Sequence, residues 1–222
     1  MGQTCNESGA MIITGDTKVV EKGSADGLFI NTAGIGVIEN DYVQKEIKPG
    51  DHIIITGSIA EHGTAIIMER YKIKARGDLH SDCSPVYNII RSLAPYYNGI
   101  KLMKDPTRGG VATALNEISA SAGKGIRIYE NALPIRKEVT AVCNLLGMDP
   151  LYLASEGRVI LVVDPYISQE ILEFIRSFEN GKDSSIIGSF FDDKEGIVYM
   201  ETDIGGRRII NTLEGTMLPR IC

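Results

Sequence analysis

Four short segments of the 222-residue chain hold side chains suited to phosphate or acid–base chemistry, and the first is Lys104-Asp105-Pro106-Thr107-Arg108-Gly109-Gly110. It lies between an apolar run that predicts a strand (99–103) and a stretch with helical spacing (109–122). Two glycines that open a helix expose backbone N–H groups at its positive end, where a phosphate can bind. Asp105 would then be free to hold Mg²⁺, which commonly takes one or two carboxylates plus substrate phosphates. Alternatively, Asp105 and Thr107 only cap the helix, and the glycines only ease close packing.

The second segment is Thr14-Gly15-Asp16-Thr17-Lys18, at the end of another apolar run. Asp16, Thr17 and Lys18 offer an acid, a hydroxyl and a cation within one turn, and all three are useful against a phosphate or a developing oxyanion. The segment is not a Walker loop, because GxxxxGK[ST] is absent. A solvated turn is the simpler alternative.

The third segment is Ala154-Ser155-Glu156-Gly157-Arg158, which precedes a strand predicted over 158–163. A glutamate in a turn between a helix and a strand is usually solvated, so the residues alone favour no chemistry for Glu156. His62, in Glu61-His62-Gly63, and Asp82-Cys83 are either helix-start residues or site residues.

The fourth is the terminal thiol of Cys222. Prenylation requires a cysteine fourth from the end, so that modification is excluded. An exposed cysteine is open to oxidation, which argues against a chance placement at a mobile tip. Roughly ten extended residues span about 30 Å, enough for the thiol to visit a cleft in its own protein and then a partner. The alternative is an incidental terminal residue.

The composition excludes several classes of protein. Hydrophobic residues make up 43% and charged residues 23%, and no apolar run approaches the roughly 18 residues of a membrane span. A net charge of -6 without a basic stripe argues against nucleic-acid binding. The four cysteines are widely spaced without a CxxC pair, which fits neither a zinc site nor a disulfide framework, and no signal peptide is evident. We therefore expect a cytoplasmic protein.

Apolar runs suited to strands alternate with spacings suited to helices, which predicts a mixed α/β fold of the α+β type. The predicted strands are 10–14, 28–33, 52–57, 99–103, 125–129, 158–163, 185–190 and 197–201. The predicted helices are 63–72, 83–93, 109–122, 136–146 and 167–178. Residues 1–45 offer too little apolar surface for a core of their own and are expected to be the end of a domain. Residues 46–214 are expected to form a self-sufficient domain, and 215–222 a flexible tail.

Taken together, several motifs make the chain similar to the HypE family, the hydrogenase-maturation carbamoyl dehydratases. The family lies within the aminoimidazole-ribonucleotide-synthetase-like (PurM-like) superfamily of ATP-binding enzymes. The matching motifs are ITGDTKVV (13–20), LFINTAGIG (28–36), HGTAI (62–66), SDCSP (81–85), DPTRGG (105–110), SEGR (155–158) and LPRIC (218–222). Family members begin with a further stretch, roughly a third of the protein, so the chain resembles a carboxy-terminal portion. The resemblance implies a PurM-like C-terminal domain preceded by a remnant of the N-terminal ATP-binding domain.

The resemblance further implies ATP-dependent dehydration of a carbamoyl group on the sulfur of Cys222. A HypF-like carbamoyltransferase would load the thiol, and a HypC-HypD-like scaffold would receive the resulting cyanide for a [NiFe]-hydrogenase. By family position Glu156 is the candidate base and Lys18 its electrostatic partner. The residues expected to bind ATP are Asp105, Thr107, Gly109 and Gly110 and, less strongly, Asp16 and Thr17. Asp105 is also the expected ligand of Mg²⁺.

The absent stretch leads to further expectations: weak ATP binding by this chain alone, and unpaired strand edges in residues 1–45 that invite self-association. Homodimerisation is common in the superfamily. Two alternatives remain open at this point. The first is another ATP-dependent enzyme of the superfamily, such as a ribonucleotide synthetase or a selenide kinase, although these lack a terminal Pro-Arg-Ile-Cys. The second is a non-enzymatic carrier that docks partners and presents Cys222.

Overall fold

The computed structural model describes residues 1–25, 27–37, 42, 44–73 and 77–213. The chain divides into two units, Met1–Tyr42 and Val43–Cys222. Cys222 and the rest of the predicted tail from residue 215 lie outside the described residues. The two units are described separately.

Among its described residues the first unit contains one helix, α1 (Gly2–Ser8), followed by chain without helix or strand. Neither predicted strand, 10–14 or 28–33, is present among its described residues, so both predictions were wrong. Their apolar side chains are exposed: Met11 is 85% and Phe29 76% accessible. Strand pairing needs a partner for the backbone groups, and the described part of this unit supplies none.

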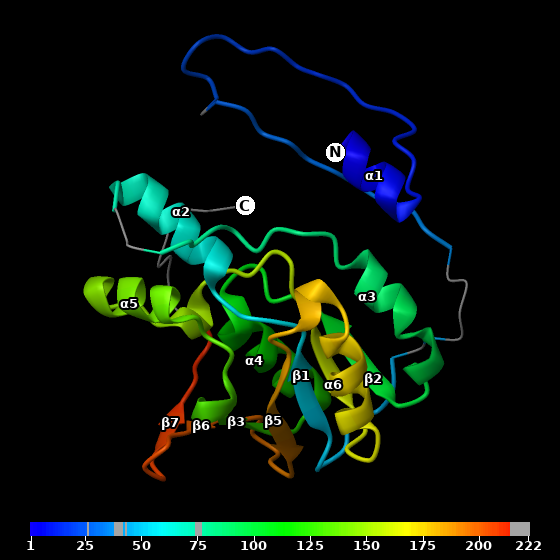
Figure 1. Cartoon of the computed structure of the whole chain (residues 1–222), viewed down its shortest axis with the longest axis vertical. Coiled ribbons are helices and arrows are strands. Elements are labelled where there is room, and N and C mark those ends of the chain that lie inside the picture. The colour runs from blue at the N-terminus through cyan, green and yellow to red at the C-terminus, as the bar shows by residue number, and fades with distance from the viewer. Residues whose placement is uncertain (26, 38–41, 43, 74–76, 214–222) are drawn as a thin grey trace. The chain divides into compact units, whose positions relative to one another are not determined.

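The second unit is built on one seven-stranded sheet in the order β2-β4-β1-β5-β3-β6-β7 (Figure 1). The strands are β1 (His52–Ile55), β2 (Ile100–Lys104), β3 (Gly125–Tyr129), β4 (Ile160–Val163), β5 (Ser185–Phe191), β6 (Val198–Glu201) and β7 (Arg207–Ile209). All neighbours are antiparallel except β3 and β6, which are parallel. The carboxyl ends of β1, β2 and β3 therefore lie at the same edge of the sheet as the amino ends of β4 and β5.

The helices of this unit are α2 (Glu61–Tyr71), α3 (Tyr87–Ser92), α4 (Gly110–Ala122), α5 (Lys137–Leu146) and α6 (Ser168–Arg176). Short 3-10 turns lie at Ala94–Tyr96, Glu130–Ala132, Pro150–Tyr152 and Glu179–Gly181. No helix among the described residues is both long and apolar enough to cross a membrane.

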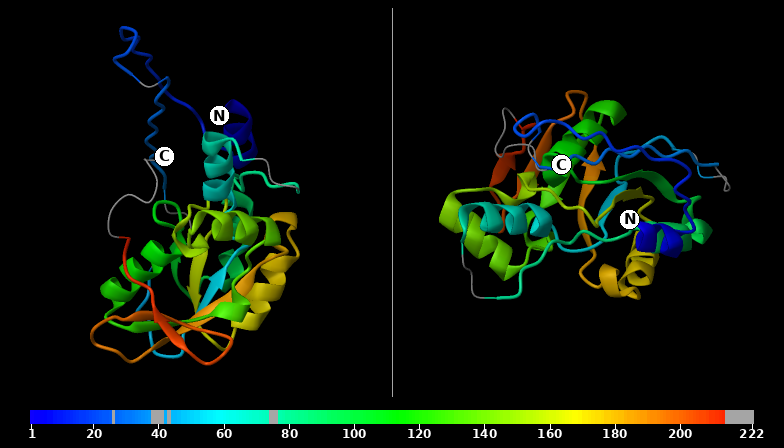
Figure 2. Two further views of the ribbon diagram at one scale, coloured as in Figure 1. Left: turned by 90° about the vertical axis from the view of Figure 1, so that its left-hand side faces the viewer. Right: turned by 90° about the horizontal axis from the view of Figure 1, so that it is seen from above.

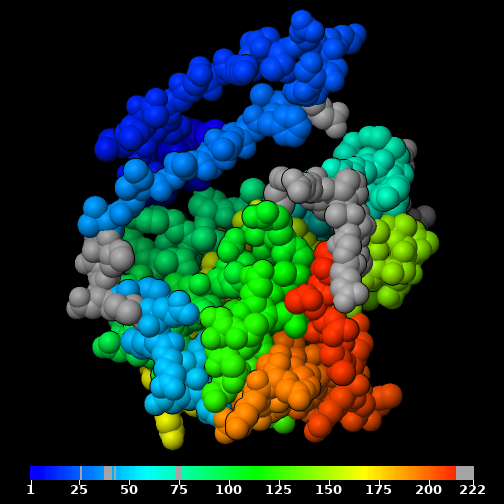
Figure 3. All heavy atoms as spheres, turned by 180° about the vertical axis from the view of Figure 1, so that it is seen from behind, coloured from blue at the N-terminus to red at the C-terminus, as the bar shows by residue number. Residues whose placement is uncertain are grey.

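Helices cover both faces of the sheet, with α4 on one face and α6 on the other (Figures 1 and 2). The interior strand β4 is accordingly buried along its whole length, as expected for a strand with helices on both sides. On the α4 face, Asn116 donates to the carbonyl of Ile210 and Ser119 to that of Gly196. These bonds join α4 to the chain around β6 and β7, and the green, orange and red segments lie side by side in Figure 3.

The predicted elements of this unit agree with the structure in type and nearly in extent. The helix predicted over 83–93 begins later, at Tyr87, because the residue before Pro85 is disfavoured in helical conformation. Strand β7 was not predicted. Its three residues, Arg207, Arg208 and Ile209, are exposed and lack the apolar alternation that marks a half-buried strand.

Candidate functional site

Three loops that follow or precede neighbouring strands meet at the sheet edge described above. The loop after β2 and the segment before β4 are joined by a hydrogen bond from the Ser155 N–H to the Pro106 carbonyl (3.1 Å). The loop after β1 joins the same segment, because the Ala60 N–H donates to Ser155 Oγ (2.9 Å). Strand order thus brings the DPTRGG, SEGR and HGTAI motifs together, although they are far apart in the sequence.

The SDCSP motif enters the same cluster through the carboxylate of Asp82. Asp82 Oδ1 accepts the N–H of His62 (3.1 Å) and the N–H of Glu156 (3.2 Å). Because both groups donate to one oxygen atom, the backbones of His62 and Glu156 are near neighbours. Burial raises the pKa of Asp82, against the lowering effect of the Glu156 N–H and the charge of Arg158.

A network of buried charges underlies these loops. The carboxylate of Glu61 accepts from Arg136 Nη1 (3.0 Å), Arg158 Nη2 (3.1 Å) and Ser58 Oγ (2.7 Å). Arg158 Nε lies 3.5 Å from Asp82 Oδ2, and the side chain of Asp82 is 0% exposed. Two acids and two guanidinium groups balance each other here, so each acid is buried beside an opposite charge. Sequence reasoning missed this role for Glu61 and Arg136, since nothing in their local pattern distinguishes them from solvated residues.

The structure leads to a stability prediction for Asp82→Asn. Because the pKa of Asp82 is raised in the folded state, protonation of Asp82 stabilises the fold. This stabilisation is fully present below the ordinary pKa of 3.8 and is lost as the pH rises through the pKa of the folded state. Asparagine keeps an oxygen acceptor and does not titrate. The free energy of unfolding of Asp82→Asn, relative to wild type, should therefore rise between about pH 3 and about pH 7. Urea unfolding across this range measures it, and a difference independent of pH would contradict it.

Gly157 is required where the SEGR and SDCSP segments touch. A Cβ atom at this position would lie 2.0 Å from the Asp82 carbonyl oxygen and 2.4 Å from Ser84 Oγ. We expect Gly157→Ala to lower the free energy of unfolding by about 3 kcal/mol, because the backbone must shift. Gly123→Ala is the control, because Gly123 has a left-handed backbone conformation and nothing lies within 4 Å of a Cβ atom built on it. This substitution should lower the free energy of unfolding by only about 1 kcal/mol, the cost of placing an alanine in that conformation. Equal losses in chemical unfolding would contradict the steric argument.

Asp105 lies directly after β2 and is exposed, as the strand-then-loop pattern predicts. Its Oδ2 accepts a hydrogen bond from Thr107 Oγ1 (3.2 Å). The described residues contain no group of three or more His, Cys, Asp or Glu side chains placed to hold a metal ion. An exposed single carboxylate is still compatible with Mg²⁺ whose other ligands are phosphate oxygens and water.

Gly109 and Gly110 have structural roles at the start of α4. Both adopt positive φ, 72° and 61°. A Cβ on Gly110 would lie 2.5 Å from the carbonyl oxygen of Leu151 and 2.6 Å from that of Leu153. The alternative of close packing therefore accounts for Gly110, whose N–H donates to the Thr107 carbonyl (3.1 Å).

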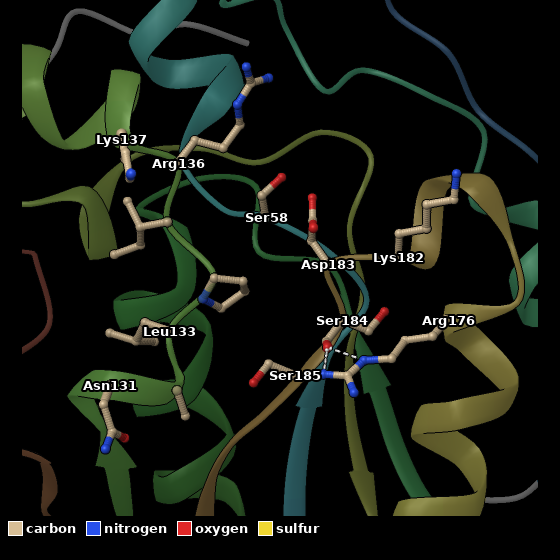
Figure 4. A pocket seen from close by; sticks show the side chains of 13 residues that line it. Ser58, Asn131, Leu133, Arg136, Lys137, Arg176, Lys182, Asp183, Ser184 and Ser185 are labelled. Carbon is tan, nitrogen blue, oxygen red and sulfur yellow. Dashed lines mark hydrogen bonds between the residues drawn. The ribbon is translucent and has the colours of Figure 1, made fainter.

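A pocket of about 520 Å³ opens beside the charge network, between residues 131–137 and 182–185 (Figure 4). Arg176 lines it and donates from Nε and Nη2 to the Ser184 carbonyl (3.0 and 2.7 Å). Two further cations that line the pocket are Arg136, which is paired with Glu61, and Lys182, which is paired with Glu179. The pocket is thus polar, and its lining holds four cationic side chains, with Lys137 the fourth, against one acid, Asp183.

The remaining predicted site residues belong elsewhere. Asp16, Thr17 and Lys18 are exposed residues of the first unit, where the Thr17 N–H donates to Asp16 Oδ1 (2.8 Å). Cys222, the predicted carrier, falls outside the described residues. The structure thus brings Glu156 together with Asp105 and Thr107. The placement of Lys18 and Cys222 beside them stays a prediction.

Comparison with known proteins gives a consistent result. Residues 48–201 match the family described as "AIR synthase related protein, C-terminal domain". This match and the mixed sheet confirm the predicted fold class. The chain is 43% identical over its whole length to "Carbamoyl dehydratase HypE" of Rhizobium leguminosarum bv. viciae, and it spans 64% of that relative's length.

Two solved structures resemble the chain closely. A hydrogenase maturation protein HypE in complex with ATP has a TM-score of 0.94 and 39% identity, covering 100% of this chain and 68% of that one. A HypE-HypF complex has a TM-score of 0.91 and 42% identity, covering 96% of this chain and 70% of that one.

Proposed function

Since the chain belongs to the HypE family, we propose that it takes part in the ATP-dependent dehydration of an S-carbamoyl group on Cys222 to a thiocyanate. The product is the source of the cyanide ligand of a [NiFe]-hydrogenase iron centre. One observation carries the proposal: Glu156 and the Asp105–Thr107 loop lie at one sheet edge, tied together through Ser155 and Pro106. A proton acceptor and a nucleotide-binding loop must be neighbours for this reaction.

The chemistry explains why these residue types are needed. The oxygen of a carbamoyl group is a poor leaving group, and transfer of the terminal phosphoryl group of ATP to it creates a good one. A base must then remove protons from nitrogen, and we assign this step to Glu156. Lys18 stabilises the charge that develops on the oxygen. Asp105 would hold Mg²⁺, which would supply positive charge against the phosphates. We assign Thr107, Gly109 and Gly110, with Asp16 and Thr17, to nucleotide contact.

The proposed partners follow from the same chemistry. A HypF-like carbamoyltransferase supplies the carbamoyl group, and a solved HypE-HypF complex supports this partner. A HypC-HypD-like scaffold accepts the cyanide. We also propose a cytoplasmic location, because the described cysteines Cys5, Cys83 and Cys143 are free thiols, as suits a reducing compartment.

The test is to incubate the chain with a HypF-like carbamoyltransferase, carbamoyl phosphate and ATP. Phosphate release together with thiocyanate on the chain, detected by intact mass and infrared absorption, is the expected result, at a rate limited by the weak ATP binding expected of this chain alone. A carbamoyl adduct that never loses water would instead favour the carrier alternative, in which the chain presents Cys222 without turning over ATP.

A further inference from the structure

The cluster around Asp82 contains an imidazole that the proposed function does not use. His62 is the second residue of α2 and is partly exposed. Its Nδ1 lies 2.8 Å from Ser81 Oγ, which fixes the orientation of the ring. Ser81 Oγ also accepts the Cys83 N–H (3.1 Å), so the hydroxyl itself is held in place.

Asp82 holds His62 beside Glu156. One carboxylate oxygen accepts the backbone N–H of both residues, and Gly157 is pressed against the Asp82 carbonyl. Asp82 is buried, so a relative shift of the two residues would cost the desolvated carboxylate a hydrogen bond. Asp82 therefore fixes the backbones of two residues whose side chains can accept protons, His62 and Glu156.

The proposed dehydration removes two protons from nitrogen, one in each half of the reaction. In its first half the carbonyl oxygen bonds to the terminal phosphorus of ATP, the bond from that phosphorus to the bridging oxygen breaks, ADP leaves, and nitrogen releases one proton. In its second half nitrogen releases its other proton. The electron pair forms the third bond to carbon as the C–O bond breaks, and phosphate leaves with the former carbonyl oxygen. One carboxylate can hold only one of the two protons.

We propose that His62 is the second catalytic proton acceptor, and that Asp82 is the positioning residue that sets it next to Glu156. This inference rests on the proposed function and adds a residue to it. A neutral imidazole suits the task, because His is the side chain whose charge changes near neutral pH. When Nδ1 donates to Ser81 Oγ, Nε2 is the ring nitrogen that can accept a proton.

The chain offers a matched control. His52 Nδ1 lies 2.8 Å from Ser168 Oγ, so it makes the same kind of His–Ser contact at the start of β1, away from the Asp82 cluster. His62→Gln should slow thiocyanate formation from the preloaded carbamoyl chain by about 100-fold, while carbamoylation is unchanged. His52→Gln should leave both steps unchanged. Added imidazole should restore part of the rate in His62→Ala.

A second measurement needs no activity. In the ¹⁵N-labelled chain the amide protons of His62 and Glu156 should shift together as acid protonates Asp82, and in Asp82→Asn neither should show this transition. Separate titrations would contradict the shared anchor. A normal dehydration rate in His62→Gln would contradict the second acceptor while leaving the proposed function intact. Absence of thiocyanate in the wild type would contradict the proposed function itself, and this inference with it.

Discussion

Replacement of Cys222 by alanine should remove the carbamoyl adduct entirely. The proposed reaction needs a thiol that can visit both the carbamoyltransferase and the sheet edge near Glu156. Hydroxyl and amine groups do not replace it, because the thiolate is the stronger nucleophile at neutral pH. Intact mass after incubation with carbamoyltransferase, carbamoyl phosphate and ATP, followed by peptide mapping, measures the adduct.

The other cysteines supply the controls for this experiment. Cys83 is exposed, so Cys222→Ala, which retains it, tests whether an accessible thiol is sufficient, and we expect Cys83→Ala to carry the normal adduct. Cys143 is buried in α5, and burial raises the pKa of its thiol, so it should stay unmodified. An adduct that persists in Cys222→Ala, or that maps to Cys5, Cys83 or Cys143, would overturn the assignment.

Glu156→Gln and Lys18→Ala should each block dehydration and leave carbamoylation intact. Loss of a general base costs typically about 100- to 10,000-fold, and loss of a charge that stabilises a developing oxyanion about 100- to 1,000-fold. Carbamoylation requires neither, since the carbamoyltransferase performs it. Single-turnover decay of the carbamoyl adduct in the presence of ATP separates the two steps.

Matched variants guard against a general charge effect. Glu173→Gln removes a carboxylate from the exposed face of α6, and Lys22→Ala removes an exposed cation from the first unit; both should behave as wild type. If Lys18→Ala dehydrates normally while Glu156→Gln does not, Lys18 has no part in the reaction and the charge on oxygen must be stabilised by another group. If both variants are normal, the assignment of the base is wrong as well.

The sequence by itself indicated the family and the helices and strands that the structure describes between residues 52 and 201. Apolar alternation in segments such as 125–129 and 185–190 predicts strands because one or both faces must be buried, and that pattern is local. The same pattern failed at 10–14 and 28–33, where the residues are apolar but the strand form depends on a neighbour to pair with. Strand β7 was not predicted for the opposite reason, since Arg207 and Arg208 are exposed and show no apolar alternation.

Only the tertiary structure decided which motifs share a site. The order β2-β4-β1 places the ends of three strands at one edge, and so joins Pro106 to Ser155 and His62 to Glu156 through a buried Asp82. The charge balance of Glu61 with Arg136 and Arg158 likewise depends on contacts between residues 75 and 97 positions apart. Sequence spacing does not predict such contacts, because they arise from strand pairing and desolvation and not from interactions between residues that are close in the sequence.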